Sequence, residues 1–302
     1  MNHPDHHHHA ARLVALQGTG AGAWLAAIPA MPSLRMSSPD TGMTVRLRLG
    51  LPLPILPSGT KCTCGALLDK GADHLFVCPV GGNQTTRHDG SVRAWALVLR
   101  EAGGSVTPEV PLGTLNPCLA EAARRAHEQE GREEGSHSRG AAAKVMDLVK
   151  VAPENEWYDV TIFHPGAARA KRCARAADTT TISASRAKHV KYDEAAKASG
   201  VRFTPLTATT WGGWGPEAVA TIRGISRRLK ERAEALNEHP PAPGLFAARA
   251  WALLGVNLCR GNAALVRNKA IAAVDLPHKG HSRSLPHGDD VRISVVGEGG
   301  GR

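Results

Sequence analysis

Two aspartates lie in the middle of short apolar runs between residues 143 and 165. The runs are VMDLV, which contains Asp147, and WYDVTI, which contains Asp159, and a Pro-Glu-Asn turn separates them. Two β-rich runs joined by a turn predict a hairpin. A lone carboxylate on an apolar strand is costly to bury, and two neighbouring carboxylates that share a cation suit Mg²⁺ or Mn²⁺. Spacing alone leaves an alternative, in which one aspartate is a turn residue at a strand end and the other faces water.

A second group of reactive side chains precedes the aspartates and contains Cys62, Cys64, His74 and Cys78. Three thiols and one imidazole in so short a window match a tetrahedral Zn²⁺ site, and soft thiolates select zinc over hard cations. The alternative is three buried free cysteines and an unrelated histidine. A zinc knuckle of this size is structural, and it can also present basic residues to nucleic acid.

The residues after the cysteines predict a helix that begins near the pair Arg87-His88. Val92, Trp95 and Leu99 recur at helical spacing. Arg93 lies off that apolar stripe, so it either contacts phosphates or belongs to a solvated face. Beyond the helix, a Pro-interrupted edge strand carries Glu109, which is a further candidate metal ligand.

The stretch Ser183–Ser199 predicts another helix, which ends at Gly200. Lys188 and Lys191 are three residues apart and therefore share one face of this helix, next to Tyr192. Their position after the two aspartates could bring a positive charge to the carboxylates.

Composition bounds the class of protein and its partners. The chain has 302 residues and a net charge of +10, which makes an acidic polymer such as DNA or RNA the expected partner. No apolar run reaches the roughly 18 residues that a membrane span needs. The N-terminus lacks the apolar segment of a signal peptide, and six unevenly spaced cysteines indicate a reducing, intracellular compartment.

Changes in composition divide the chain into five expected parts. The first ten residues, with a run of histidines, are left out of the fold. The parts are an N-terminal irregular or helical segment at 1–57, a zinc knuckle at 58–90, an α/β core at 91–238 with insertions at 113–142 and 166–182, a helical region at 239–276 and a disordered tail at 277–302.

The knuckle, the two aspartates and the motif Lys188-x-x-Lys191-Tyr192 together resemble a known family. The chain is similar to the restriction-like PD-(D/E)XK endonuclease domain of site-specific non-LTR retrotransposon reverse transcriptases, in which a Cys-Cys-His-Cys knuckle precedes the nuclease. The segment around KYDEAAKASGVRFTPLTATTWGGWGPEA also resembles reverse-transcriptase-derived reading frames of algae and protists. The resemblance spans roughly residues 12–270.

This resemblance implies an α/β fold with a mixed central sheet flanked by helices, and Mg²⁺-dependent or Mn²⁺-dependent nicking of DNA in the nucleus. Asp147 and Asp159 would hold the catalytic ion, and Lys188, with Lys191 as substitute, would act on the attacking water or the phosphate. The implied structural zinc ligands are Cys62, Cys64, His74 and Cys78, and the implied nucleic-acid contacts are Arg87, His88, Arg93 and Tyr192.

The chain departs from the family pattern at three points. Met146 stands where the motif has proline, Thr161 stands where it has lysine, and a polymerase domain is absent. The lysine role therefore falls to the helix at 183–199. We expect a relic or a fragment whose partner is a reverse transcriptase domain outside this chain. The alternative function is a nucleic-acid-binding module that keeps the zinc knuckle but has lost catalysis.

Overall fold

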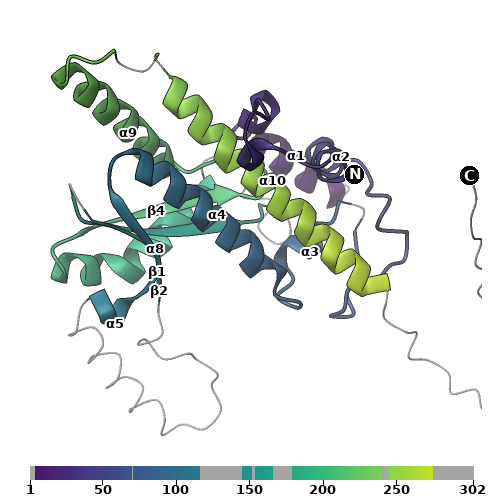
Figure 1. Cartoon of the computed structure of the whole chain (residues 1–302). Helices are drawn as coiled ribbons and strands as arrows, with labels where there is room; N and C mark the ends of the chain where they lie inside the picture. The colour runs from purple at the N-terminus through teal and green to yellow at the C-terminus, as the bar shows by residue number, and fades with distance from the viewer. Residues whose placement is uncertain are drawn as a thin grey trace, which may run out of the picture.

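The computed structural model describes residues 4–69, 71–115, 145–151, 154–165, 179–239, 242 and 244–274, and within them the chain forms helices around one sheet (Figure 1). The helices are α1 (Pro4–Leu16), η1 (Ala23–Ala26), η2 (Pro32–Leu34), α2 (Ser38–Leu49), α3 (Asp73–Val77), α4 (Asn83–Glu101), α5 (Leu112–Leu115), α8 (Thr179–Ala198), α9 (Pro216–Ala235) and α10 (Leu245–Val274). The strands are β1 (Ser105–Pro111), β2 (Val145–Val151), β3 (Glu156–Phe163) and β4 (Arg202–Thr209). The described chain is therefore a mixed α/β structure, as its pattern predicts.

The four strands form a mixed sheet in the order β1-β2-β3-β4. β1 and β2 are antiparallel, β2 and β3 form the antiparallel hairpin that the two apolar runs predict, and β3 and β4 are parallel. The parallel pair needs a crossover, which α8 provides, because parallel neighbours cannot be joined by a tight turn.

A buried ion pair lies beside the turn of the β2–β3 hairpin. Lys150 and Glu156 are paired in the register, their charged groups lie 2.9 Å apart, and both side chains are 1% exposed. A buried charge is costly without its partner, so this pair disfavours a shifted register. The register that it favours runs through Leu148 and Tyr158, where pairing between the two strands ends.

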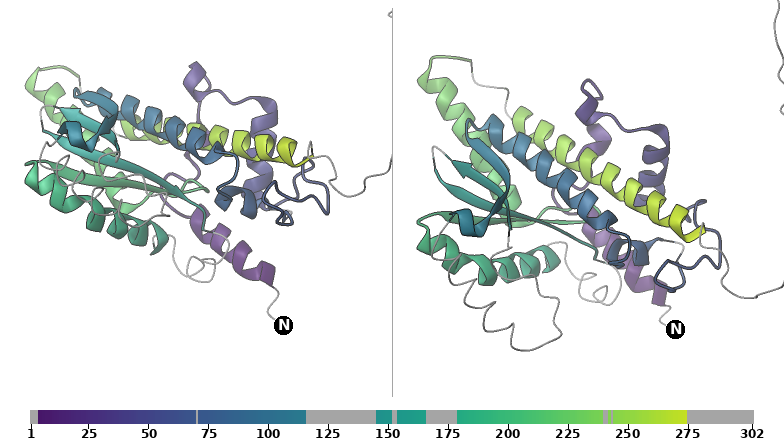
Figure 2. Two further views of the ribbon diagram at one scale, coloured as in Figure 1. Left: turned by 90° about the horizontal axis from the view of Figure 1, so that it is seen from below. Right: turned by 60° about the horizontal axis from the view of Figure 1, so that its bottom comes forward.

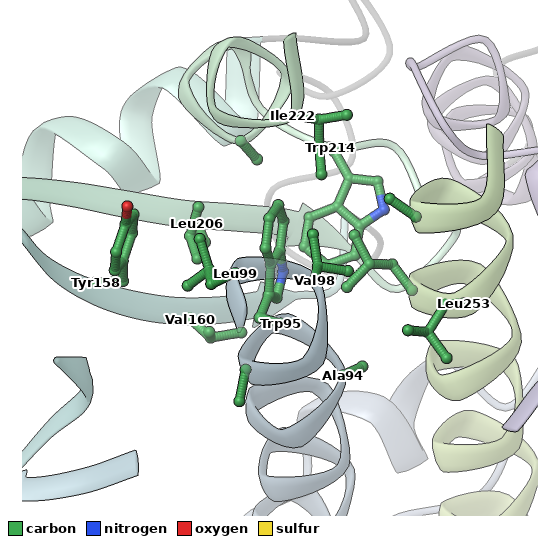
Figure 3. Packing of buried hydrophobic residues seen from close by; sticks show 14 of the residues in the cluster. Ala94, Trp95, Val98, Leu99, Tyr158, Val160, Leu206, Trp214, Ile222 and Leu253 are labelled. Carbon is green, nitrogen blue, oxygen red and sulfur yellow. The ribbon is translucent and has the colours of Figure 1, made fainter. Parts of the chain in front are cut away.

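Helices cover both faces of the sheet. α4 and α10 lie side by side on one face, and α8 lies on the other (Figure 2). The first face holds the main core, where Trp95 and Trp214 meet edge to face with ring centroids 5.3 Å apart (Figure 3). Burial of large apolar side chains of this kind contributes about 1.5–3 kcal/mol each. The other face is packed by a smaller cluster that includes Trp157, Tyr192 and Phe203.

A third cluster joins the knuckle to the C-terminal helix. Leu75 and Phe76 of α3 pack together with Leu265 and Val266 of α10. α10 is 30 residues long, so it contacts the main core with its first half and the knuckle with its second. No helix in the described part of the chain is long and apolar enough to cross a membrane.

Several sequence-based boundaries need correction. Helix α1 begins at Pro4 and includes most of the histidine run, so excluding residues 1–10 from the fold was wrong. Helix α8 begins at Thr179, which removes residues 179–182 from the predicted second insertion. Residues 116–142 of the first insertion, residues 166–178 of the second, and the tail at 277–302 lie outside the described residues.

Candidate functional site

The two aspartates border one cavity of about 720 Å³, at the point where β2 and β3 separate. Pairing ends at Leu148 and Tyr158; Asp147 directly precedes Leu148 on β2, and Asp159 directly follows Tyr158 on β3. Since pairing stops there, backbone groups of β3 are left for side chains to satisfy. The cavity wall includes Phe76, Val77, Arg87, His88, Val145, Asp147, Asp159, Val160, His164, Lys188 and Tyr192.

Val160 has no paired residue on β2, and the side chain of Asp147 satisfies its backbone instead. The Val160 backbone N–H donates to Asp147 Oδ2 at 2.7 Å. His88 of α4 reaches the same point, with its Nε2 3.1 Å from Asp147 Oδ2 and 3.0 Å from the Val160 carbonyl oxygen. One carboxylate, one carbonyl and one imidazole therefore meet in the gap between the strands.

Asp159 faces helix α8 and is almost fully buried. Its carboxylate lies 2.8 Å from Lys188 Nζ, and the hydroxyl of Thr161 donates to it at 2.8 Å. The side chain of Asp159 is 5% exposed and that of Lys188 is 26% exposed. Lys188 thus reaches the aspartate despite the long insertion before α8. Lys191 instead lies over the Tyr192 ring, 4.5 Å from its centroid.

Tyr192 of α8 borders the same cavity as the two carboxylates. Burial, followed by the charges of Asp159 and Asp147, raises the pKa of its hydroxyl. The carboxylates disfavour the phenolate because like charges repel. Tyr192 is therefore a neutral hydrogen-bonding group on the face of α8 that borders the cavity.

His88 carries positive charge in this arrangement. Burial opposes the charged ring, but the carboxylates of Asp147 and Asp89 outweigh burial and raise the pKa of His88 to about 9. Its Nδ1 lies 3.4 Å from Asp89 Oδ1. His88 was predicted as a nucleic-acid contact, but its ring lies against Asp147, which was predicted to hold the ion.

Arg87 is buried, at 5% exposure, although its side chain borders the cavity. It donates to Asn262 Oδ1 at 3.2 Å, its Nε has no partner, and among the described carboxylates none lies within ion-pair distance of it. Burial lowers the pKa of Arg87 to about 10. Gly261 of α10 is needed here, since a Cβ at that position would lie 2.8 Å from Arg87 Cγ.

The four predicted zinc ligands form a compact cluster. The ligand atoms of Cys62, Cys64, His74 and Cys78 all lie within 4.8 Å of one another. Cys62 Sγ and Cys78 Sγ are 3.7 Å apart, which agrees with the edge of about 3.8 Å that two thiolates at about 2.3 Å from a tetrahedral Zn²⁺ span. The cluster can therefore hold a metal ion such as zinc.

Local backbone features fix the knuckle. Cys62 and Cys64 lie on a tight turn in which Gly65 adopts φ +88° and its N–H bonds to the carbonyl of Cys62. The Asp69 carboxylate accepts from the backbone N–H groups of Asp73 and His74 at 2.8 and 2.9 Å, which caps α3. Burial opposes ionisation of Cys62, but hydrogen bonds from the Cys64 backbone and the His74 side chain lower its pKa to about 6, toward the thiolate that binds metal.

The knuckle forms part of the cavity wall. Asp73, the neighbour of a zinc ligand, accepts from His164 at the end of β3 at 2.9 Å, and Phe76 stacks on the His164 ring with centroids 5.0 Å apart. From α10, the buried Lys269 donates to the carbonyl of Leu75 at 3.2 Å and to that of Cys78. Loss of the knuckle would therefore remove one side of the cavity.

Two predicted residues lie away from the cavity. Arg93 is exposed on α4, and Glu109 is exposed in β1 with φ +54°. Glu109 lies between the residues that pair with Leu148 and Met146, so it is opposite Asp147 in the register, but it does not border the cavity and its role as a ligand stays a prediction. Asp73, His164 and Lys269 were missed, because nothing in their local sequence links residues so far apart.

The cysteine–histidine cluster and the groups around the two aspartates differ in how well they suit a metal ion. In the described part of the chain, the Cys62–Cys78 cluster is the compact group of three or more metal-ligating side chains. At the aspartates, the donors nearest one another are one carboxylate, one carbonyl and one imidazole, and Asp159 is held separately by Lys188.

Comparison with known proteins gives no family for this chain. No protein-family model matches it, and no curated protein matches it.

Proposed function

We propose that the chain is a metal-dependent endonuclease that nicks DNA, with the restriction-like core of non-LTR retrotransposon nucleases. The observation that carries the proposal is that Asp147 and Asp159 border one cavity at the end of a strand pair, with the Lys188 ammonium 2.8 Å from Asp159. Two carboxylates and an ammonium group around a single cavity can together serve phosphodiester hydrolysis.

The residues would divide the work as follows. The chemistry supplied by Mg²⁺ or Mn²⁺, when bound, would be polarisation of the scissile phosphate and a lowered pKa of a coordinated water. Asp147 and the Val160 carbonyl would hold the ion. Lys188, oriented by Asp159, would neutralise the charge that develops on the phosphate or orient the attacking water. Tyr192, which is 3% exposed, would form the cavity wall beside Lys188, whose Nζ lies 5.8 Å from the Tyr192 ring centroid.

An anionic substrate also fits the charges on the wall. Arg87 is a buried guanidinium that, among the described residues, has no carboxylate within ion-pair distance, and a buried charge without its counterion is costly. A phosphate group that enters the cavity would supply that counterion. The net charge of +10 would draw such a polymer toward the protein over longer distances.

A plasmid-nicking assay tests the proposal. We expect the zinc-loaded chain to convert supercoiled plasmid to the open circular form in Mg²⁺ or Mn²⁺, to leave 5′-phosphate and 3′-hydroxyl ends, and to stop when EDTA is added. A parallel reaction on single-stranded and double-stranded RNA separates DNA from RNA as substrate. Absence of strand breaks with every divalent ion would contradict the proposal.

The alternative is a binding module without catalysis. It is favoured by one observation, namely that the protein's own cations, His88 and Lys188, already pair with the two aspartates. This alternative predicts DNA affinity that falls steeply with salt, as counterion release requires, without cleavage. For both functions we further propose, from the resemblance, that the chain acts in the nucleus with a reverse transcriptase domain as partner. Microscopy of a tagged chain tests the location, and co-purification tests the partner.

A further inference from the structure

The imidazole of His88 is spaced like a ligand of the proposed ion. Its Nε2 lies 3.1 Å from Asp147 Oδ2 and 3.0 Å from the Val160 carbonyl oxygen. Neighbouring ligands of an octahedral ion at about 2.1 Å are about 3.0 Å apart. The nitrogen therefore stands at the separation from each of the two oxygens that neighbouring ligands of one ion would have.

We propose that His88 is a third protein ligand of the divalent ion, beside Asp147 and the Val160 carbonyl, and that it favours a transition-metal ion such as Mn²⁺ over Mg²⁺. The inference rests on the proposed function, because it assumes that Asp147 holds an ion. Mg²⁺ prefers oxygen ligands and gives up its water reluctantly, whereas imidazole is a common ligand of transition metals.

The surroundings of His88 fit this role. The ring is carried by α4, whose Val92 and Trp95 are buried against the sheet, so its backbone is held in place. The Asp89 carboxylate lies 3.4 Å from Nδ1, and a carboxylate on the second nitrogen is the usual way in which a ligating histidine is oriented. Ion binding would release the Nε2 proton to solvent, because imidazole binds metal in its neutral form.

Pulsed EPR of bound Mn²⁺ tests the proposal directly. The zinc-loaded full chain is mixed with less than one equivalent of Mn²⁺, and modulation from ¹⁴N is recorded for the native chain, His88→Ala, His88→Asn and Asp147→Asn. Affinity is followed by the loss of the free Mn²⁺ signal, and Mg²⁺ affinity by competition. His189→Ala is the matched control, because His189 bonds Asp193 and Glu217 on α8 and α9, outside the cavity.

We expect nitrogen modulation in the native chain and in His189→Ala, and its loss in both His88 variants. Their Mn²⁺ affinity should fall about tenfold or more, with Mg²⁺ affinity changed less than threefold. Any nitrogen modulation that remains in Asp147→Asn comes from Mn²⁺ bound to other histidines, such as those near the N-terminus. This background is subtracted from the spectra of the other proteins. Unchanged Mn²⁺ binding in the His88 variants, with binding lost in Asp147→Asn, would overturn the role of His88 alone. Binding unchanged in all variants would overturn the metal site of the proposed function.

Discussion

Replacing Asp147 with asparagine should lower the rate of metal-dependent plasmid nicking by about 10³-fold or more while the chain stays folded. The asparagine oxygen can still accept the Val160 N–H that Asp147 accepts at 2.7 Å, so the local backbone contact survives. What is lost is the negative charge that would hold the ion. The measurement is the initial rate of open-circle formation at saturating Mn²⁺, with circular dichroism of both proteins.

Asp159→Asn should have an effect of similar size, because it removes the group that orients Lys188 at 2.8 Å. The matched control is Asp193→Asn, which lies on α8 like Lys188 but is 58% exposed and does not border the cavity. The control should nick at the native rate. Equal rates in all four proteins would show that the two aspartates are not the catalytic acids.

Removal of zinc should produce the largest change in stability. Structural zinc sites bind with apparent free energies of about 10–16 kcal/mol at neutral pH, and much of that energy is folding energy. The knuckle also packs Leu75 and Phe76 against α10, so its loss exposes apolar surface in the third cluster. If about 5 kcal/mol is lost, the melting temperature should fall by roughly 10–20 °C. Calorimetry before and after treatment with a zinc chelator measures this.

Removal of zinc should also abolish nicking, because the zinc knuckle supplies Phe76 and Val77 to the cavity wall. Cys62→Ser should reproduce the loss of zinc. Cys259→Ser is the control, since Cys259 is a buried cysteine of α10 outside the ligand cluster and should leave one zinc bound per chain. A chain that melts at the same temperature with and without metal would contradict a structural role for this site.

The sequence predicts the parts of the site whose residues are close together both in the sequence and in the fold. Cys62 and Cys64 are two residues apart on a turn, His74 lies on α3, and Cys78 directly follows that helix. Four ligands within 17 residues can therefore meet without help from the rest of the fold. The β2–β3 hairpin is local in the same sense, since two apolar runs and a short turn fix which strands pair. Asp147 and Asp159 follow from that pairing.

The parts that were missed depend on packing between distant segments. His88 reaches Asp147 because α4 packs on the sheet, and the two residues are 59 positions apart. Lys269 bonds the knuckle backbone across more than 190 positions. Arg87 was expected at a surface, but the crossing of α4 and α10 at Gly261 buries it. A single sequence offers no periodicity or spacing that links such pairs.

The central claim is that Asp147, at the end of the β2–β3 pair, holds a divalent ion for phosphodiester cleavage, with Lys188 oriented by Asp159. Anomalous diffraction at the manganese edge, on crystals of the zinc-loaded chain soaked in Mn²⁺, tests it most directly. The account predicts a manganese peak in the cavity at about 2.2 Å from an Asp147 carboxylate oxygen, with Asp159 and Lys188 facing it. Manganese found elsewhere, with the cavity free of metal at saturating Mn²⁺, would contradict the account.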